Sequence, residues 1–233
     1  MLKDFNNDLA KWKPLLKISK YSLWLILFFV VIQIFVYVFS PPPKDVIGFF
    51  NLYQKSPILG LLSLDLIMLL DWIIEIPIFL SLYILLRRKN ESYMLLATVL
   101  AMIGIAIYFA SGVAFEMLLL SNQYVQATNE IQKNILLSAG QSLLVRYQGT
   151  AFNVSYVLVA IAFLIDSIVM LKSEIFTKKT AYFGIAMGVL MLLPPTAGKI
   201  GFICSFLSLI PMIVWFILVA KKFSQLSAIN PKS

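Results

Sequence analysis

The sequence contains no histidine, a single cysteine (Cys204) and few charged residues, which make up 13% of the chain. The absence of histidine excludes Ser-His-Asp chemistry, histidine-ligated zinc and bis-histidine haem. One cysteine cannot build the disulfide framework of a small secreted module. Apolar residues make up 61% of the chain, whereas a soluble domain has about 45–50% apolar and about 25% charged residues. The chain is therefore predicted to be an all-α, polytopic membrane protein.

Long apolar segments occur along the whole chain. A transmembrane helix needs about 20 mostly apolar residues to cross a hydrocarbon core about 30 Å thick. Six segments meet this requirement: 21–40, 58–86, 93–120, 151–171, 180–198 and 200–220. They predict a six-helix transmembrane bundle that forms a single integral membrane domain over residues 1–233.

The fifth segment differs from the other five. Pro194 and Pro195 interrupt it, so it can be either a short span or a re-entrant helix. We expect the two prolines to end or bend this helix near the outer surface, and Gly198 to permit a tight return into the sixth span. Gly184 and Gly188 have the spacing that allows close helix packing in membranes.

The basic residues divide unevenly between the two sides of the predicted spans. All 19 lie outside the six windows. With the N-terminus inside, fourteen fall on the inner side and five on the outer side, namely Lys44, Lys55, Lys133, Arg146 and Lys199. The positive-inside rule therefore predicts an inner (plasma) membrane protein with both termini in the cytoplasm. Basic loops beside anionic headgroups also explain the net charge of +8, so no nucleic acid is required as a partner.

Three segments outside the spans carry apolar side chains. Before the first span, Phe5, Leu9, Trp12 and Leu16 recur at helical spacing, which predicts a short interfacial amphipathic helix, broken at Pro14.

The other two segments lie on the predicted outer side. Residues 45–53 are too few to span and rich in aromatic side chains, so we expect them at the level of the headgroups. Residues 121–150 place several apolar side chains at near-helical spacing: Ile131, Ile135, Leu136, Leu143 and Leu144. This pattern predicts an external amphipathic helix folded over the bundle, and a binding lid is the alternative.

Polar side chains inside the predicted spans are the most informative residues for function. They are Asp65, Asp71 and Glu75 in the second span, Glu116 near the outer end of the third, and Asp166 and Asn153 in the fourth. A carboxylate at the bilayer centre costs about 2.5–3.5 kcal/mol, so such groups usually face the bundle interior and often mark a pathway. No lysine or arginine lies inside a predicted span, which leaves protonation, a bound cation, or water and backbone donors to neutralise the acids.

The acids fall into an inner and a more external group in the predicted bundle, and Asp166 lies near the depth of Glu75. Asp71 and Glu75 are one helical turn apart, about 40° from each other around the helix axis. We expect them to face inward and to share fewer than two negative charges at neutral pH. Asp65 and Glu116 share a more external level. The alternative for every acid is a neutral, hydrogen-bonded group or one that water reaches, and the positions of Asp65 and Glu116 favour this alternative.

The sequence contains none of the motifs that would indicate catalysis. A Gly-x-Gly-Asp context, a His-Glu-x-x-His motif, a P-loop and a Gly-x-Gly-x-x-Gly run are all absent, and the cytoplasmic loops are too short for a catalytic domain. We therefore predict no enzymatic activity, no cofactor and no metal site.

Two functions remain open. One is the proton- or cation-linked movement or sensing of a small solute through a polar interior, with Asp71 and Glu75 as the leading residues. The other is a non-transporting scaffold or accessory subunit that binds another membrane protein. A homo-oligomer also stays open, and the lipid bilayer surrounds the chain in every case.

Five short runs in the chain are similar to a known family. They are GTAFNVSYVL at 149–158, SEIFTK at 173–178, TAYFGI at 180–185, PPTAG at 194–198 and PMIVW at 211–215. Together they resemble a family of prokaryotic six-span membrane proteins catalogued as a domain of unknown function, number 4386. The resemblance covers residues 20–225 and is most specific after residue 145. It implies six spans in a helical bundle, and it implies no activity or catalytic residues.

Overall fold

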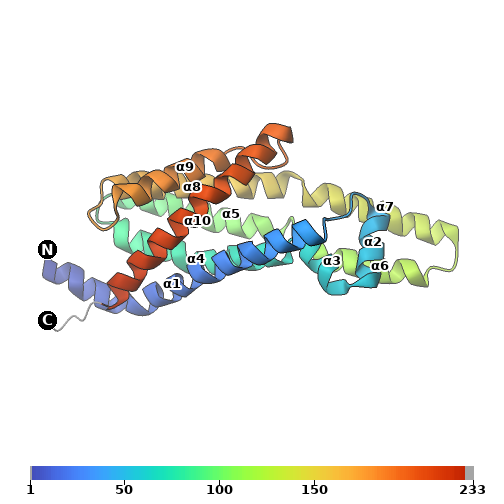
Figure 1. Ribbon diagram of the computed structural model, residues 1–233, viewed down its shortest axis with the longest axis horizontal. Coiled ribbons are helices and arrows are strands. Elements are labelled where there is room, and N and C mark those ends of the chain that lie inside the picture. The colour runs from blue at the N-terminus through green and yellow to red at the C-terminus, as the bar shows by residue number, and fades with distance from the viewer. Residues whose placement is uncertain (1, 229–233) are drawn as a thin grey trace. The chain divides into compact units, whose positions relative to one another are not determined.

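A computed structural model describes residues 2–228, with side chains from Lys11 onward. This part of the chain is helical and contains no strand, which confirms the all-α prediction (Figure 1). The helices are α1 (Leu2–Phe39), α2 (Val46–Lys55), α3 (Pro57–Ser63), α4 (Leu66–Leu86), α5 (Glu91–Phe109), α6 (Ala114–Gln126), α7 (Glu130–Tyr147), α8 (Thr150–Leu171), α9 (Lys178–Met191) and α10 (Gly198–Ala228).

Five helical stretches of the described chain are long and apolar enough to cross a membrane: Lys11–Phe39, Leu66–Leu86, Glu91–Gln126, Glu130–Leu171 and Gly198–Ala228. They fit a multi-pass helical membrane protein. The predicted number of six spans is not confirmed, because α9 in the fifth predicted span has only 14 residues. At 1.5 Å per residue such a helix rises about 21 Å, which is less than the hydrocarbon thickness of about 30 Å.

Two of the predicted spans are interrupted. In residues 58–86 the helix stops at Ser63 and begins again at Leu66, after the turn at Leu64 and Asp65. In residues 93–120, α5 ends at Phe109 and α6 starts at Ala114. A hydropathy pattern cannot reveal either break, because each turn is only two to four residues long and long apolar segments lie on both sides of it.

The prediction of a break at Pro14 is wrong, because α1 continues through this proline. Packing on the C-terminal side of Pro14 fixes the helix: Leu16 and Ser19 are buried, and Ser19 Oγ lies 2.7 Å from both the Pro77 carbonyl oxygen and Ser81 Oγ of α4. Leu16 is therefore packed inside unit 1 and is not on the exposed apolar face of an amphipathic helix. The side chains of Phe5 and Leu9 lie outside the described residues.

The chain divides into two compact units. Unit 1 comprises Met1–Phe28, Trp72–Ala106 and Ser155–Ser233, and unit 2 comprises Phe29–Asp71 and Ile107–Val154. Each unit is described by itself below. The prediction of a single integral membrane domain stays a prediction.

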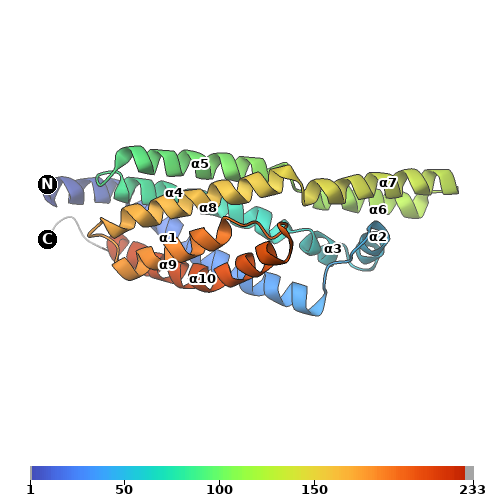
Figure 2. The same ribbon diagram turned by 90° about the horizontal axis from the view of Figure 1, so that it is seen from above.

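In unit 1, α9 packs against α10, as the ribbon shows from two directions (Figures 1 and 2). Gly184 of α9 makes this contact close, because a Cβ atom added there would lie 2.5 Å from Nε1 of the fully buried Trp215. The helix ends at Met191, and α10 begins at Gly198 with a φ of 70°, a conformation that glycine adopts without strain. The prediction that Pro194 and Pro195 end the fifth helical segment is confirmed.

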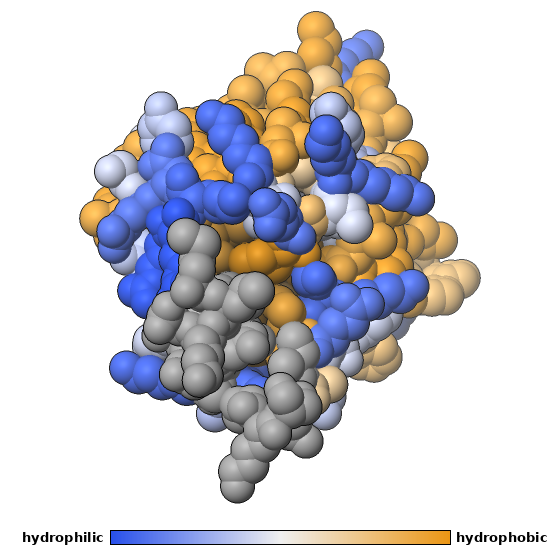
Figure 3. Space-filling view, turned by 90° about the vertical axis from the view of Figure 1, so that its left-hand side faces the viewer, coloured by the Kyte–Doolittle hydropathy of each residue, from blue (hydrophilic) through white to orange (hydrophobic). Residues whose placement is uncertain are grey.

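One end of unit 1 gathers most of its basic residues. The N-terminal part of α1, the α4–α5 and α8–α9 connections and the C-terminal end of α10 lie at this end (Figures 1 and 2). Figure 3 looks onto this end and shows hydrophilic side chains grouped around it. The basic residues of these segments are Lys11, Lys13, Lys17, Lys20, Arg87, Arg88, Lys89, Lys172, Lys178, Lys179, Lys221 and Lys222.

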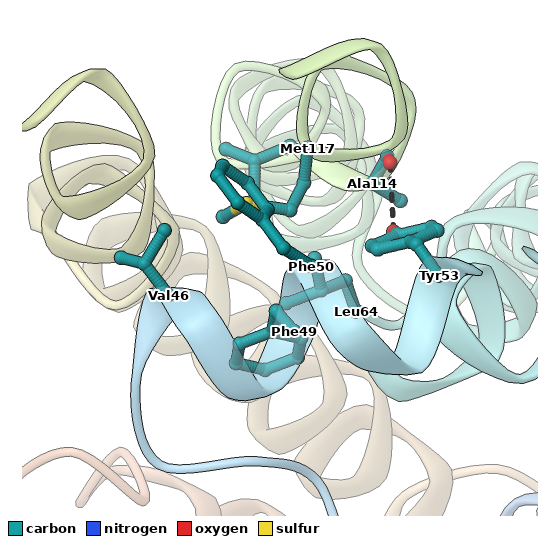
Figure 4. Packing of buried hydrophobic residues seen from close by; sticks show 8 residues of the cluster. Val46, Phe49, Phe50, Tyr53, Leu64, Ala114 and Met117 are labelled. Atoms are coloured by element: carbon teal, nitrogen blue, oxygen red, sulfur yellow. Dashed lines mark hydrogen bonds between the residues drawn. The ribbon is translucent and has the colours of Figure 1, made fainter. Parts of the chain in front are cut away.

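In unit 2, the short helix α2 packs against α3, α6 and α7. Its side chains enter a buried cluster of Val46, Phe49, Phe50, Tyr53, Leu64, Val113, Ala114 and Met117, and Figure 4 shows how most of these side chains meet. The Tyr53 hydroxyl donates to the Ala114 carbonyl oxygen over 2.7 Å. These aromatic side chains form the core of unit 2, and the expectation that residues 45–53 lie at the level of the headgroups stays a prediction.

The predicted external helix in residues 121–150 is present as α7, which packs against α6 and α2. Asn129 begins it, because its side chain accepts a hydrogen bond from the Gln132 backbone amide. The predicted apolar face is only partly buried: Leu136 is buried, whereas Ile131 and Ile135 are exposed. Leu143 and Leu144 pack against the α2 cluster.

Candidate functional site

Asp65 occupies an unusual position between α3 and α4 in unit 2. Its φ of 60° makes it the one non-glycine residue with a positive φ among the described residues. Its carbonyl oxygen accepts a hydrogen bond from the Leu69 amide, so α4 begins directly after it. The side chain is only 6% exposed. A buried acid in a strained backbone conformation is a combination that frequently marks functional sites.

Two tyrosine hydroxyls hold the carboxyl group of Asp65. Tyr37 of α1 donates to Oδ1, and Tyr147 of α7 donates to Oδ2. A carboxylate accepts at both oxygens, whereas a protonated acid must donate at one of them, so two donors suit the ionised form. Asp65 lies outside the spanning helix α4, which begins at Leu66, so its carboxyl group is not part of that span. Burial raises the pKa of its carboxyl above the ordinary value, and the Tyr147 and Tyr37 hydroxyls oppose this shift.

Asp65 lines a cavity of about 170 Å³. Other polar or charged groups of its lining are Tyr108, Ser111, Glu116 and Tyr147, and the remaining residues are apolar or glycine: Leu64, Leu66, Leu69, Phe109, Gly112, Val113, Ala114 and Phe115. The structure thus brings Asp65 and Glu116, two of the predicted site residues, to one cavity.

Glu116 has a basic partner that the sequence did not reveal. Arg146 of α7 lies 3.2 Å from Glu116 Oε1, and it also donates to the Gly112 carbonyl oxygen over 3.1 Å. Both side chains of this ion pair are about half exposed, 47% for Arg146 and 53% for Glu116. The expectation that no basic residue neutralises an acid of the spans is therefore wrong for Glu116. The α6–α7 hairpin causes the difference, since it returns Arg146 to the start of α6.

A second cavity of about 240 Å³ lies in the same unit, lined by Tyr37, Pro42, Pro43, Phe49, Ser63, Leu144, Tyr147 and Gln148. Ser63 Oγ is buried and has no hydrogen-bond partner among the described residues. Asp65 lines the first cavity, Tyr37 lines the second and Tyr147 lines both. The Tyr37–Asp65–Tyr147 bridge, as we call these hydrogen-bonded side chains, therefore stands between the two cavities.

Tyr53 adds a further polar group to the neighbouring core. Burial raises the pKa of its hydroxyl, and the negative charge of Glu116 raises it further. Tyr53 therefore stays a neutral donor to the Ala114 carbonyl.

The other predicted site residues lie elsewhere. Asp71, the last residue of unit 2, lines neither of these two cavities, and its Oδ1 is buried without a hydrogen-bond partner in the described chain. Asn153 donates to the carbonyl oxygens of Gln148 and Gly149 at the start of α8, a local structural role. Glu75 and Asp166 belong to unit 1, where Asp166 is 1% exposed and its Oδ2 has no described partner.

The sequence analysis missed the tyrosines and the arginine of this site. Tyr37 lies at the outer end of the first predicted span, the level also expected for Asp65 and Glu116, and this shared level was the one available signal. Tyrosine at that level is usually attributed to the interfacial aromatic belt. Nothing in the sequence pattern links Tyr147 or Arg146 to the second and third spans.

The described residues contain no group of three or more Asp, Glu, Cys or His side chains that could hold a metal ion. The cavities instead offer hydroxyl groups, aromatic rings and carboxyl groups. Such a lining can exchange protons and can bind a small polar or cationic molecule.

These features define a helical, multi-pass membrane protein with a buried carboxyl group between two cavities of one unit. The chain belongs to the family described as Domain of unknown function (DUF4386), which matches residues 22–226. The resemblance seen in the sequence is thereby confirmed. No curated protein and no solved structure matched the chain.

Proposed function

We propose that this protein moves a small solute across the membrane in a step linked to a proton or a cation, and that the step takes place at Asp65. The observation that carries this proposal is the Tyr37–Asp65–Tyr147 bridge between two cavities. A group that gains and loses charge between two cavities can couple the occupancy of one to access from the other.

The charges around the first cavity support the coupling. Arg146 offsets the charge of Glu116, so ionised Asp65 leaves one negative charge without a basic partner among the lining residues. Either a proton or a monovalent cation restores neutrality. Because both bind the same group, they compete, and competition at a buried carboxylate is the physical basis of proton-linked exchange.

We further propose that the protein is in the inner (plasma) membrane with both termini in the cytoplasm. The basic end of unit 1 supports this orientation, since the cytoplasmic sides of membrane proteins carry an excess of lysine and arginine (Figure 3). A reporter that is active only in the cytoplasm, fused after Ser233, should be active. Activity of a reporter that works only outside the cytoplasm would contradict the orientation.

Proton flux through the purified protein in liposomes tests the function. The liposomes contain the pH-sensitive dye pyranine, and valinomycin with a potassium gradient sets the membrane potential. We expect flux above that of empty liposomes and a loss of at least tenfold in Asp65→Asn, which keeps the side-chain shape and removes the ionisable group. The matched control Glu130→Gln changes an exposed acid on α7 and should retain the flux.

Two further results would redirect the proposal. If Asp71→Asn or Glu75→Gln removes the flux and Asp65→Asn does not, the site is in α4, as the sequence analysis predicted. If the wild-type protein carries neither a proton flux nor, in a matched assay, a sodium or potassium flux, transport without an added solute is refuted. The alternative is then a scaffold or accessory subunit with another membrane protein, or a second copy, as its partner.

A further inference from the structure

We propose that the cavity of about 170 Å³ beside Asp65 binds a small monovalent organic ammonium ion. The inference rests on the proposed function and adds the substrate class. It follows from three separate properties of the cavity: its volume, its charge and its aromatic lining.

The volume favours an organic molecule over a bare metal ion. An apolar cavity of about 150 Å³ accommodates benzene, which has six heavy atoms. A cavity of about 170 Å³ therefore fits a ligand of roughly five to eight heavy atoms. A bare sodium or potassium ion would leave most of this space unfilled. It would also require several oxygen ligands at short distance, which the mostly apolar lining does not supply.

The net charge of the groups at the cavity favours a ligand with a single positive charge. Both oxygens of Asp65 accept from tyrosine hydroxyls, and the negative charge of the ionised carboxyl group attracts a cation that enters the cavity. Glu116 is already paired with Arg146, so the charged groups at the cavity have a net charge of about −1 when Asp65 is ionised. A dication would be left partly unneutralised, and an anion would be repelled.

The aromatic residues favour an ammonium ion over a strongly hydrated cation. Tyr108 and Phe109 of α5, Phe115 of α6 and Tyr147 of α7 all line the cavity. Aromatic faces attract alkylated ammonium groups with about 0.5–1 kcal/mol per ring at exposed sites. Together with a carboxylate, such rings form the usual environment for these ions in proteins.

The ligand should compete with protons. The ionisable groups that bond to Asp65 or line the cavity with it from neighbouring helices of unit 2 are Tyr37, Tyr108, Tyr147 and Glu116, and Arg146 pairs with Glu116. Asp71 lies further along α4, on the same helix that Asp65 begins. Of these groups, Asp65 is the buried acid that lines the cavity. A proton on Asp65 removes the negative charge that attracts the ammonium ion, so acidification should weaken binding.

Isothermal titration calorimetry on the purified full-length protein in detergent tests the proposal. Tetramethylammonium chloride is the probe, sodium chloride matches its ionic strength, and tert-butanol is a neutral molecule of similar size. We expect tetramethylammonium to bind when Asp65 is ionised, and to bind more weakly as the pH is lowered from 8 to 5. Asp65→Asn should weaken binding at least tenfold, whereas the control Glu130→Gln should bind as the wild type does.

A second variant protects the test if Asp65→Asn does not fold. Phe115 is 62% exposed, so Phe115→Leu should preserve the fold while removing one aromatic ring from the cavity. We expect it to bind tetramethylammonium about two- to fivefold more weakly.

The proposal is overturned if the wild type does not bind tetramethylammonium or if tert-butanol binds equally well. It is also overturned if Asp65→Asn leaves the affinity unchanged. Where Asp65→Asn does not fold, an unchanged affinity in Phe115→Leu overturns it. Proton flux that depends on Asp65 without tetramethylammonium binding would refute the ligand class and leave the proposed function intact. Loss of both would refute both.

Discussion

Removing a tyrosine hydroxyl from the Tyr37–Asp65–Tyr147 bridge should destabilise the protein more at high pH than at low pH. Tyr37→Phe and Tyr147→Phe each delete one donor to Asp65 and keep the aromatic ring. A hydrogen bond to a charged group contributes about 1.5–3 kcal/mol, and a bond between neutral groups about 0.5–1.5 kcal/mol. We therefore expect each variant to lose about 1.5–3 kcal/mol of unfolding free energy when Asp65 is ionised.

The direction of the pH dependence follows from the pKa of Asp65. Burial raises this pKa in the folded protein. Asp65 therefore contributes stability that is present below its unfolded pKa of about 3.9 and is lost as the pH rises through the folded pKa. Each hydroxyl lowers the folded pKa and limits that loss. Without the hydroxyl the folded pKa rises further, so the variants fall further below the wild type as the pH increases.

Unfolding by sodium dodecyl sulfate in mixed micelles, measured near pH 5 and near pH 8, checks this prediction. Tyr182→Phe is the matched control, because Tyr182 is 61% exposed on α9 and is not one of the two tyrosines that donate to Asp65. It should change the unfolding free energy by less than about 0.5 kcal/mol. In an Asp65→Asn background, the two Phe substitutions should lose their pH dependence. A cost that is equal at both pH values, or that shrinks as the pH rises, would show that the hydroxyls do not hold a carboxylate.

Three further substitutions test the packing and the backbone. Gly184→Ala should cost about 1–3 kcal/mol in the same assay, because its Cβ would overlap Nε1 of the buried Trp215, and an unchanged midpoint would contradict this close contact. Gly198→Ala should cost about 1 kcal/mol through its φ of 70° alone, since nothing lies within 4 Å of its added Cβ, and Gly198→Asn should cost less. Tyr53→Phe should cost about 0.5–1.5 kcal/mol by removing the hydrogen bond to the Ala114 carbonyl oxygen, which also accepts from the backbone of α6, and an unchanged midpoint would contradict a contribution of this bond.

Hydropathy alone predicted the helical membrane class, because the cost of unpaired backbone groups in lipid leaves few other solutions for such an apolar chain. The proline pair at 194–195 predicted the end of α9, since two consecutive prolines remove the donors that a helix requires. Hydropathy could not reveal the turn at Asp65. The residues before and after it are apolar, and the turn depends on a φ of 60° at one residue.

The site was only partly predictable for a different reason. Asp65 and Glu116 could be identified because acids are costly in apolar segments. Their partners could not, since 82 positions separate Asp65 from Tyr147 and 30 separate Glu116 from Arg146. Contacts at such separations depend on how α6 and α7 fold back, and amino-acid periodicity carries no information on that return. The emphasis on Asp71 and Glu75 came from their depth and from their positions one turn apart on nearly the same helix face, without knowledge of the cavities.

The short helix α9 also affects the lipid around the protein. Its 14 residues rise about 21 Å, roughly 9 Å less than a typical hydrocarbon core. The polar backbone of the turn between Met191 and Gly198 cannot remain among acyl chains without hydrogen-bond partners. If α9 inserts beside α10 as a short span, headgroups and water should reach this turn, and the bilayer beside α9 should become thinner. Because each ångström of mismatch costs a fraction of a kcal/mol, the protein should concentrate in thin membranes and be most stable among short-chain lipids.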